Sequence, residues 1–377
     1  MKVSPMESGM NLPKTDTSSV VNGDKSMRYG IAVAGMASGE ILAIKNTFLR
    51  LFLVFYHILI IALLVINFCA AAVIFFTERR NLELSPLFLQ ISILAWYGDV
   101  TITAVISLIN CLRKSGFIAY YKQLSKLEES FAVFGINLRR KRIVRAAILA
   151  TALGWMAASI NIGTKLYDYA LPETQDPFYD VHFAERLNSN LTYLLLKWLG
   201  RVAVLYIGCQ WTLVVFQYVL TCFTILTIAA DFNKKFEQDV NASPKEAVQN
   251  INQYRVAHLL LCDLVSKAND CFSVILAVKI SLGVLQLLLI FYLLSIGTSG
   301  PNAIDMAGIF AYWVISGGSI LVVYIVTAHK VSEMVSSATK IGKKKFKACM
   351  PKGNDFINNH TNIRVTCAAQ NVCNFQA

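Results

Sequence analysis

The stretch from Asn252 to Gly297 constrains the fold more than any other part of the chain. It begins as an amphipathic helix and becomes almost wholly apolar with no proline or loop signal before Ile280. As one helix it is about 69 Å long, more than twice a hydrocarbon core of about 30 Å. We therefore expect a continuous helix that crosses a membrane and continues outside it. A short juxtamembrane helix followed by a separate span is the alternative.

The composition supports a polytopic membrane protein. Hydrophobic residues make up 55% of the 377 residues and charged residues only 15%, and the mean hydropathy is +0.52. A soluble core of this length cannot bury that much apolar side chain. The net charge of +12 is explained by basic loops, so no nucleic-acid partner is expected. No cleavable signal peptide is expected, because no apolar core follows a basic start in the first 44 residues.

Six apolar segments are long enough to span a membrane as helices, which predicts an all-α bundle. They are Phe48–Phe76, Pro86–Leu112, Ile143–Ile162, Leu191–Ala230, the Asn252–Gly297 helix and Ala303–Thr327. The fourth is also overlong, so the fourth and fifth helices are expected to continue into the cytoplasm as a hairpin. We expect residues 1–44 to be a disordered cytoplasmic arm with a segment that could re-enter the membrane. Residues 45–347 form the transmembrane helical domain, and residues 348–377 an irregular cytoplasmic tail.

Charge in the connections predicts the orientation. Basic residues gather in 113–142 and after the sixth span, whereas 164–190 is mostly acidic. Because positive residues stay inside, the amino terminus and the carboxyl tail are expected in the cytoplasm. Asn190, in Asn-Leu-Thr, then lies outside and is a candidate glycosylation site, although an unmodified sequon is an equal alternative.

The sequence shows no pattern of an enzyme. The five histidines lie far apart, no nucleophile or phosphate-binding motif is present, and the nine cysteines include no Cys-x-x-Cys pair. We expect neither catalysis nor a cofactor nor a metal site.

Charges inside apolar runs are the most informative polar residues. A charge near the bilayer centre costs about 2.5–3.5 kcal/mol unless it faces protein or water. Asp99 could pair with Lys279 or Arg201, or these residues could line a hydrated ligand cavity. For Arg201, near the outer end of its span, extension of the side chain toward the interface is the favoured alternative.

Aromatic side chains with polar tips lie at similar depths. Such rings can stack on a small polar ligand, but membrane-interface belts use the same residues, and a belt is the favoured alternative. The candidate ligand-binding residues are Trp96, Tyr97, Asp99, Trp155, Arg201, Tyr206, Tyr292, Tyr312 and Trp313. Trp198 and Trp211 lie in the same slab.

Two short stretches resemble the insect gustatory receptor family and its invertebrate gustatory receptor-like relatives. One leads into the fifth span and carries Tyr254, His258, Leu261, Leu264, Asn269 and Phe272. The other leaves the sixth span and reads TAHKVSEMVSSA from 327 to 338. The resemblance implies a multi-pass protein of the cell membrane that binds a small-molecule tastant and contacts membrane lipid. It also implies a ligand-gated cation channel, usually a homo- or hetero-tetramer with other receptor subunits. The six residues of the first stretch are then candidate assembly residues.

The chain departs from that family after Lys347. Family members carry a seventh helix that lines the pore, with a Thr-Tyr and a later Gln-Phe, whereas no span of about 18 residues can be drawn in 348–377. We expect an incomplete or alternatively spliced product, or a member that does not conduct alone. A secondary transporter and a G-protein-coupled receptor are the alternatives, although no internal repeat and no Asp-Arg-Tyr-like triplet is found.

Overall fold

The computed structural model describes residues 47–78, 84–133, 135–136, 138–170, 190–243, 250–296 and 303–349. These ranges form seven helices and contain no strand. The all-α expectation is therefore confirmed over the described part of the chain. The expected arm at 1–44 lies outside these ranges, and so does almost all of the expected tail.

Six of the described helices are long and apolar enough to cross a membrane, as the sequence predicts. They are α2 (Thr47–Glu78), α3 (Leu84–Leu112), α5 (Arg140–Ala170), α7 (Asn190–Ala242), α9 (Ile251–Ile296) and α10 (Ala303–Cys349). The prediction of an unbroken fifth helix is confirmed, because α9 runs without interruption for 46 residues. The alternative of two separate helices is wrong.

Two helices differ from the sequence prediction. The sixth span was expected to end at Thr327, but α10 continues to Cys349, since no proline interrupts the chain before Pro351. A further helix, α4 (Phe117–Val133), forms in the segment expected only as a basic connection. Its buried residues recur at helical spacing. They include Phe117, Tyr120, Leu124, Leu127 and Phe131.

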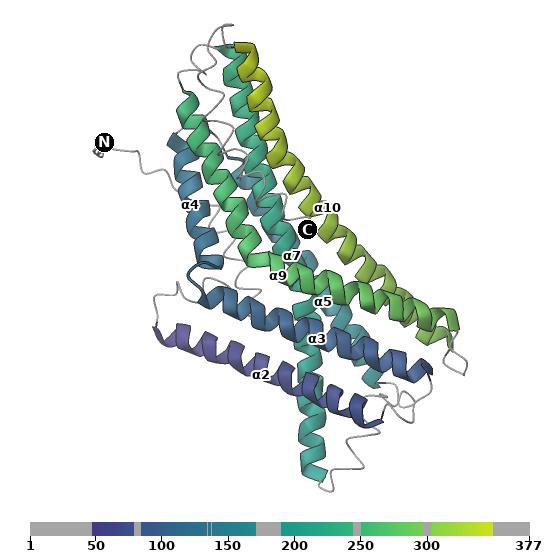
Figure 1. Cartoon of the computed structure of the whole chain (residues 1–377). Coiled ribbons are helices and arrows are strands. Elements are labelled where there is room, and N and C mark those ends of the chain that lie inside the picture. Colours follow the sequence, from purple (N-terminus) through teal and green to yellow (C-terminus); the bar gives the residue numbers. More distant parts are fainter. Residues whose placement is uncertain are drawn as a thin grey trace.

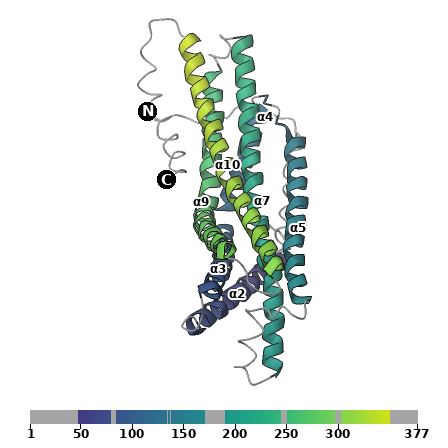
Figure 2. The same ribbon diagram turned by 90° about the vertical axis from the view of Figure 1, so that its right-hand side faces the viewer.

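Three helices, α7, α9 and α10, are much longer than a bilayer is thick. The 53 residues of α7 and the 47 of α10 correspond to about 80 Å and 70 Å, against a hydrocarbon core of about 30 Å. In Figure 1 both rise together to the upper end of the molecule, and in Figure 2 they still lie side by side. Figure 1 also shows that α9 bends, so that one half lies along α4 and the other along α3.

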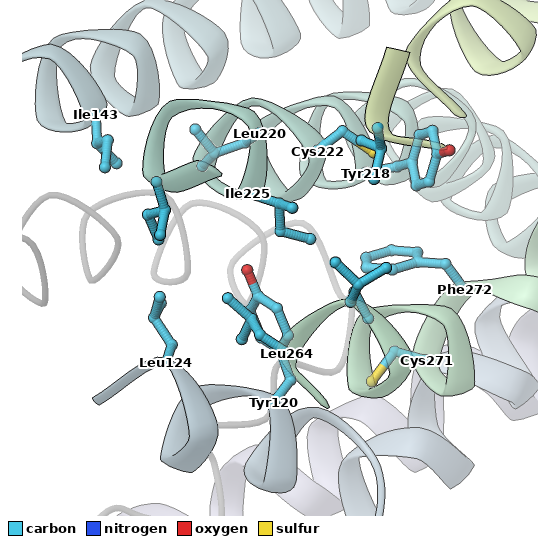
Figure 3. Packing of buried hydrophobic residues seen from close by; sticks show 14 of the residues in the cluster. Tyr120, Leu124, Ile143, Tyr218, Leu220, Cys222, Ile225, Leu264, Cys271 and Phe272 are labelled. Carbon is cyan, nitrogen blue, oxygen red and sulfur yellow. The ribbon is translucent and has the colours of Figure 1, made fainter. Parts of the chain in front are cut away.

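The largest hydrophobic core joins α4, α5, α7, α9 and α10. Phe272 of α9 belongs to this core, and its ring packs edge-on against Phe117 of α4 at 5.6 Å and Tyr218 of α7 at 5.4 Å between ring centroids. Figure 3 shows Phe272 and Tyr218 facing each other across this core, with Leu264 and Tyr120 nearby. One aromatic side chain thus holds three helices together.

The polar side chain of Asn110 fastens α3 to α9. Its amide Nδ2 donates to the backbone carbonyl of Cys271 at 2.7 Å, and the residue is buried. Closer to the start of α9, Gln123 of α4 donates to the carbonyl of Leu260 at 3.2 Å. The two contacts fix α9 against α3 and α4 at two points along its length.

Candidate functional site

A buried ion pair joins α3 to α9. Lys279 Nζ lies 2.6 Å from Asp99 Oδ2, and both side chains are only 4% exposed. The hydroxyl of Thr103 adds a longer contact of 3.4 Å to Asp99 Oδ1. Because each charge alone would be costly inside a membrane span, the pair offsets much of the cost of burying both. The structure therefore contains one of the two pairings that the sequence suggested.

A cavity of about 70 Å³ lies beside this pair, between α3, α7, α9 and α10. This volume is several times the roughly 10–15 Å³ that one water molecule needs. Three indole rings line it, those of Trp96, Trp211 and Trp313. Trp96 also packs near Trp313, with a distance of 6.4 Å between ring centroids. The lining therefore offers flat apolar surfaces next to a pair of opposite charges.

Glycines let α9 and α10 approach each other at the cavity. A Cβ atom at Gly283 of α9 would lie 3.3 Å from Leu321 Cδ2 of α10, and one at Gly317 of α10 would lie 3.4 Å from Leu287 Cδ2 of α9. Each helix thus places a glycine under a leucine of the other. Such small residues are typical of close helix contacts in membranes.

The structure brings some of the candidate ligand-binding residues together and separates others. Trp96, Asp99 and Trp313 line the cavity, and Tyr97 stacks on Trp96 at 5.7 Å from a buried position.

Four other candidates lie outside the cavity lining. Tyr206 bonds Tyr56 of α2 at 2.9 Å between the two hydroxyl oxygens, and Tyr292 packs edge-on against Phe88 at 4.5 Å. Trp155 packs at the large core, and Tyr312 is half-buried away from the lining. The side chain of Arg201 lies outside the described residues.

Several lining residues were not among the candidates for ligand binding. The polar ones are Ser92, Gln286 and Tyr324, and the others include Trp211 and the two glycines, whereas Lys279 was expected either in a pair with Asp99 or in the wall of a cavity. Lys279 and Trp211 did stand out in the sequence, as a charge and an indole inside apolar runs. Gly283 and Gly317 carried a signal too, since glycine in a membrane span often marks close helix contact.

The candidate assembly residues pack within the chain itself. Leu261 and Leu264 are fully buried, and Phe272 is buried at the core already described. The Tyr254 hydroxyl donates to Asp239 of α7, and the His258 ring lies 6.2 Å from that of Phe232. Asn269 is half-buried. These side chains hold α9 against α4 and α7, so those that are fully buried are not available to a second subunit.

Asn190 is the first residue of α7, and its side chain lies outside the described residues. Its glycosylation stays a prediction. Among the described residues, no group of three or more histidine, cysteine, aspartate or glutamate side chains is arranged to hold a metal ion.

Comparison with known proteins defines the class. A family model described as "7tm Chemosensory receptor" matches residues 30–345. The chain therefore belongs to this chemosensory receptor family, a family of multi-pass membrane receptors and not of enzymes. It is accordingly a multi-pass protein of the cell membrane. The resemblance seen in the sequence is confirmed at this level.

A solved structure supports the fold. The insect olfactory receptor OR5 from Machilis hrabei matches over 95% of this chain and 90% of its own, with a TM-score of 0.63 at 12% sequence identity. No curated protein sequence matches the chain. The expected absence of a pore-lining seventh helix concerns residues outside the described part of the chain, and it stays a prediction.

Proposed function

We propose that this chain is a chemosensory receptor subunit of the gustatory type, which binds a small molecule in the Trp96–Trp211–Trp313 cavity and gates a cation channel. The observation that carries the proposal is the position of this cavity. It lies among four helices of a chemosensory receptor and beside a buried ion pair. Pockets with apolar walls and a few polar groups are the usual form of small-molecule sites.

The path from ligand to channel follows α9. One half of this helix lines the cavity through Lys279, Gly283 and Gln286, and the other half packs against α4 and α7. A ligand shifts a conformational equilibrium only if it binds one state better than the other. A molecule that fits the cavity best when α9 has moved relative to α3 meets that condition, and the continuous helix carries the movement to its far end.

We further propose that the chain works in an oligomer, with homo- or hetero-tetramers as the expected form. The inner face of α9 is occupied by the chain's own core, but Val256 and Leu259 on the same helix are 49% and 46% exposed. These two residues offer an apolar surface to a neighbouring subunit outside the lipid. We propose that the chain needs such further subunits to conduct.

Whole-cell recording tests this function. Cells that express the chain, alone and with a second receptor subunit, are exposed to sugars, bitter compounds and small carbonyl compounds while surface delivery is measured. We expect cation currents in the co-expressing cells, and we expect Trp313→Ala to lower the response at least tenfold. Trp155→Ala is the matched control, since this indole lies outside the cavity. Silence in both kinds of cell, despite normal surface delivery, contradicts the channel proposal.

A further inference from the structure

The cavity wall carries hydrogen-bond donors that the chain does not use. The ammonium group of Lys279 has three N–H donors. In the described part of the chain it has one acceptor, Asp99 Oδ2, and the side chain is 4% exposed. Lys279 also lines the cavity. Its remaining donors are therefore available to a molecule held there.

Two hydroxyl groups in the same wall lack partners. The hydroxyls of Ser92 on α3 and Tyr324 on α10 have no hydrogen-bond partner among the described residues. The two residues are only 2% and 1% exposed, and both line the cavity. Buried polar groups are nearly always hydrogen-bonded. Together with Lys279, these hydroxyls indicate a ligand that accepts hydrogen bonds.

The charges of the site oppose a charged ligand. Asp99 and Lys279 neutralise each other at 2.6 Å, so a carboxylate or an ammonium ligand would bring an unpaired charge into a buried space. Acceptors in the wall are also partly occupied. The Asp99 carboxylate accepts from Lys279 and Thr103, and the Ser92 carbonyl accepts from Gln286 at 3.4 Å. A polyol, which must place several donors of its own, finds mainly the Ser92 and Tyr324 hydroxyl oxygens as acceptors, so it matches the wall less well than a ligand that only accepts.

We infer that the cavity takes a small, uncharged molecule with a compact apolar body and a carbonyl-type oxygen, such as a ketone, ester or lactone. The oxygen accepts from Lys279 and from the Ser92 or Tyr324 hydroxyl, while the apolar body packs against the three indoles. The inference rests on the proposed function in one respect, namely that this cavity is the ligand site.

Four probes of equal ring size test this ligand class. The full chain is reconstituted in lipid nanodiscs, and dissociation constants are measured at pH 7 by saturation-transfer NMR. The probes are cyclohexanone, cyclohexanol, cyclohexanecarboxylate and cyclohexylamine, and empty nanodiscs correct for partition into lipid. We expect cyclohexanone to bind at least tenfold more tightly than the two charged probes and at least threefold more tightly than the alcohol.

Variants locate the binding. Ser92→Ala and Tyr324→Phe each remove only a hydroxyl group, and we expect each to weaken binding of cyclohexanone by about 2- to 10-fold. Tyr218→Phe is the matched control. Its hydroxyl is also buried, but Tyr218 does not line the cavity. The Tyr218→Phe variant should bind cyclohexanone with the same dissociation constant as the unchanged chain.

Three results overturn the inference. These are tight binding of the alcohol or of either charged probe, no binding of any probe, and binding of cyclohexanone that neither hydroxyl deletion weakens. A failure of this ligand class can be told apart from a failure of the channel proposal. Ketone binding without any current refutes the channel alone, whereas currents from ligands insensitive to both hydroxyl deletions refute the ligand class alone.

Discussion

At the scale of single residues, the Asp99–Lys279 pair makes a sharp prediction. Lys279→Met leaves the Asp99 carboxylate buried without its partner, and we expect the free energy of unfolding to fall by about 3–5 kcal/mol. Asp99→Leu combined with Lys279→Met removes both charges and should cost far less, or even stabilise the fold. Chemical denaturation of the purified chain in detergent measures both effects.

The Lys235–Asp239 pair is the control for this experiment. It lies within α7, and its side chains are 34% and 33% exposed. Lys235→Met should therefore cost at most about 1 kcal/mol. If Lys279→Met costs no more than Lys235→Met, or if the double variant is as unstable as the single one, the ion pair does not have the role described.

At the scale of elements, the turn between α3 and α4 depends on Gly116. A Cβ atom at this position would lie 1.9 Å from the carbonyl oxygen of Asn110, and the Gly116 N–H donates to the Arg113 carbonyl at 3.1 Å. Because this carbonyl oxygen belongs to the backbone, a change in side-chain conformation cannot relieve the clash. We expect Gly116→Ala to lower the free energy of unfolding by at least about 1–3 kcal/mol.

Hydrogen exchange of the α4 amides checks this prediction, since a distorted turn should loosen that helix first. Gly318→Ala on α10 is the matched control, because nothing lies within 4 Å of its Cβ position. That change should leave stability unaltered or raise it by up to about 1 kcal/mol. Equal protection of α4 in the two variants contradicts the steric explanation.

The start of α5 depends on a carboxylate from α7. Asp231 accepts from the Arg139 backbone N–H at 3.0 Å and from Arg139 Nε at 2.6 Å, just before α5 begins at Arg140. We expect Asp231→Ala to cost about 1.5–3 kcal/mol, since it removes charge-assisted hydrogen bonds. Asp231→Asn keeps one acceptor and should cost less.

Thermal unfolding in detergent compares the two Asp231 variants with Asp270→Ala, which breaks only an exposed contact of 3.8 Å to Lys267. Equal losses in all three would rule out this role.

At the scale of the whole molecule, the six membrane-crossing helices in the described part of the chain predict that both termini lie on the same side of the membrane. The basic connections predict that this side is the cytoplasm. Epitope tags at the two termini should therefore stay unstained in intact cells and become stained after permeabilisation. A third tag, inserted between residues 171 and 189, should be stained in intact cells. Surface staining of the amino-terminal tag overturns the orientation, whatever the third tag shows.

The membrane-spanning helices follow from the sequence because hydrocarbon leaves little choice. A run of about 20 apolar residues can satisfy its backbone in lipid only as a helix. The absence of a breaker between Asn252 and Ile280 likewise predicted the unbroken α9. Helix α4 and the last part of α10 were missed since they are more polar. Such helices are stabilised by packing against neighbours, as Phe117 and Leu127 show at the core.

For the site, the sequence by itself determined which side chains had to find a partner or a cavity. Asp99 and Lys279 stood out because an unpaired charge in a membrane span is costly. Only the tertiary structure decided that Asp99 pairs with Lys279, and that Trp96, Trp211 and Trp313 meet while Trp155 faces another core. The physical reason is that the hydropathy of a segment predicts only how deep in the membrane a residue lies. Which helices are neighbours, and which faces they turn to each other, depends on contacts such as those of Gly283 and Gly317.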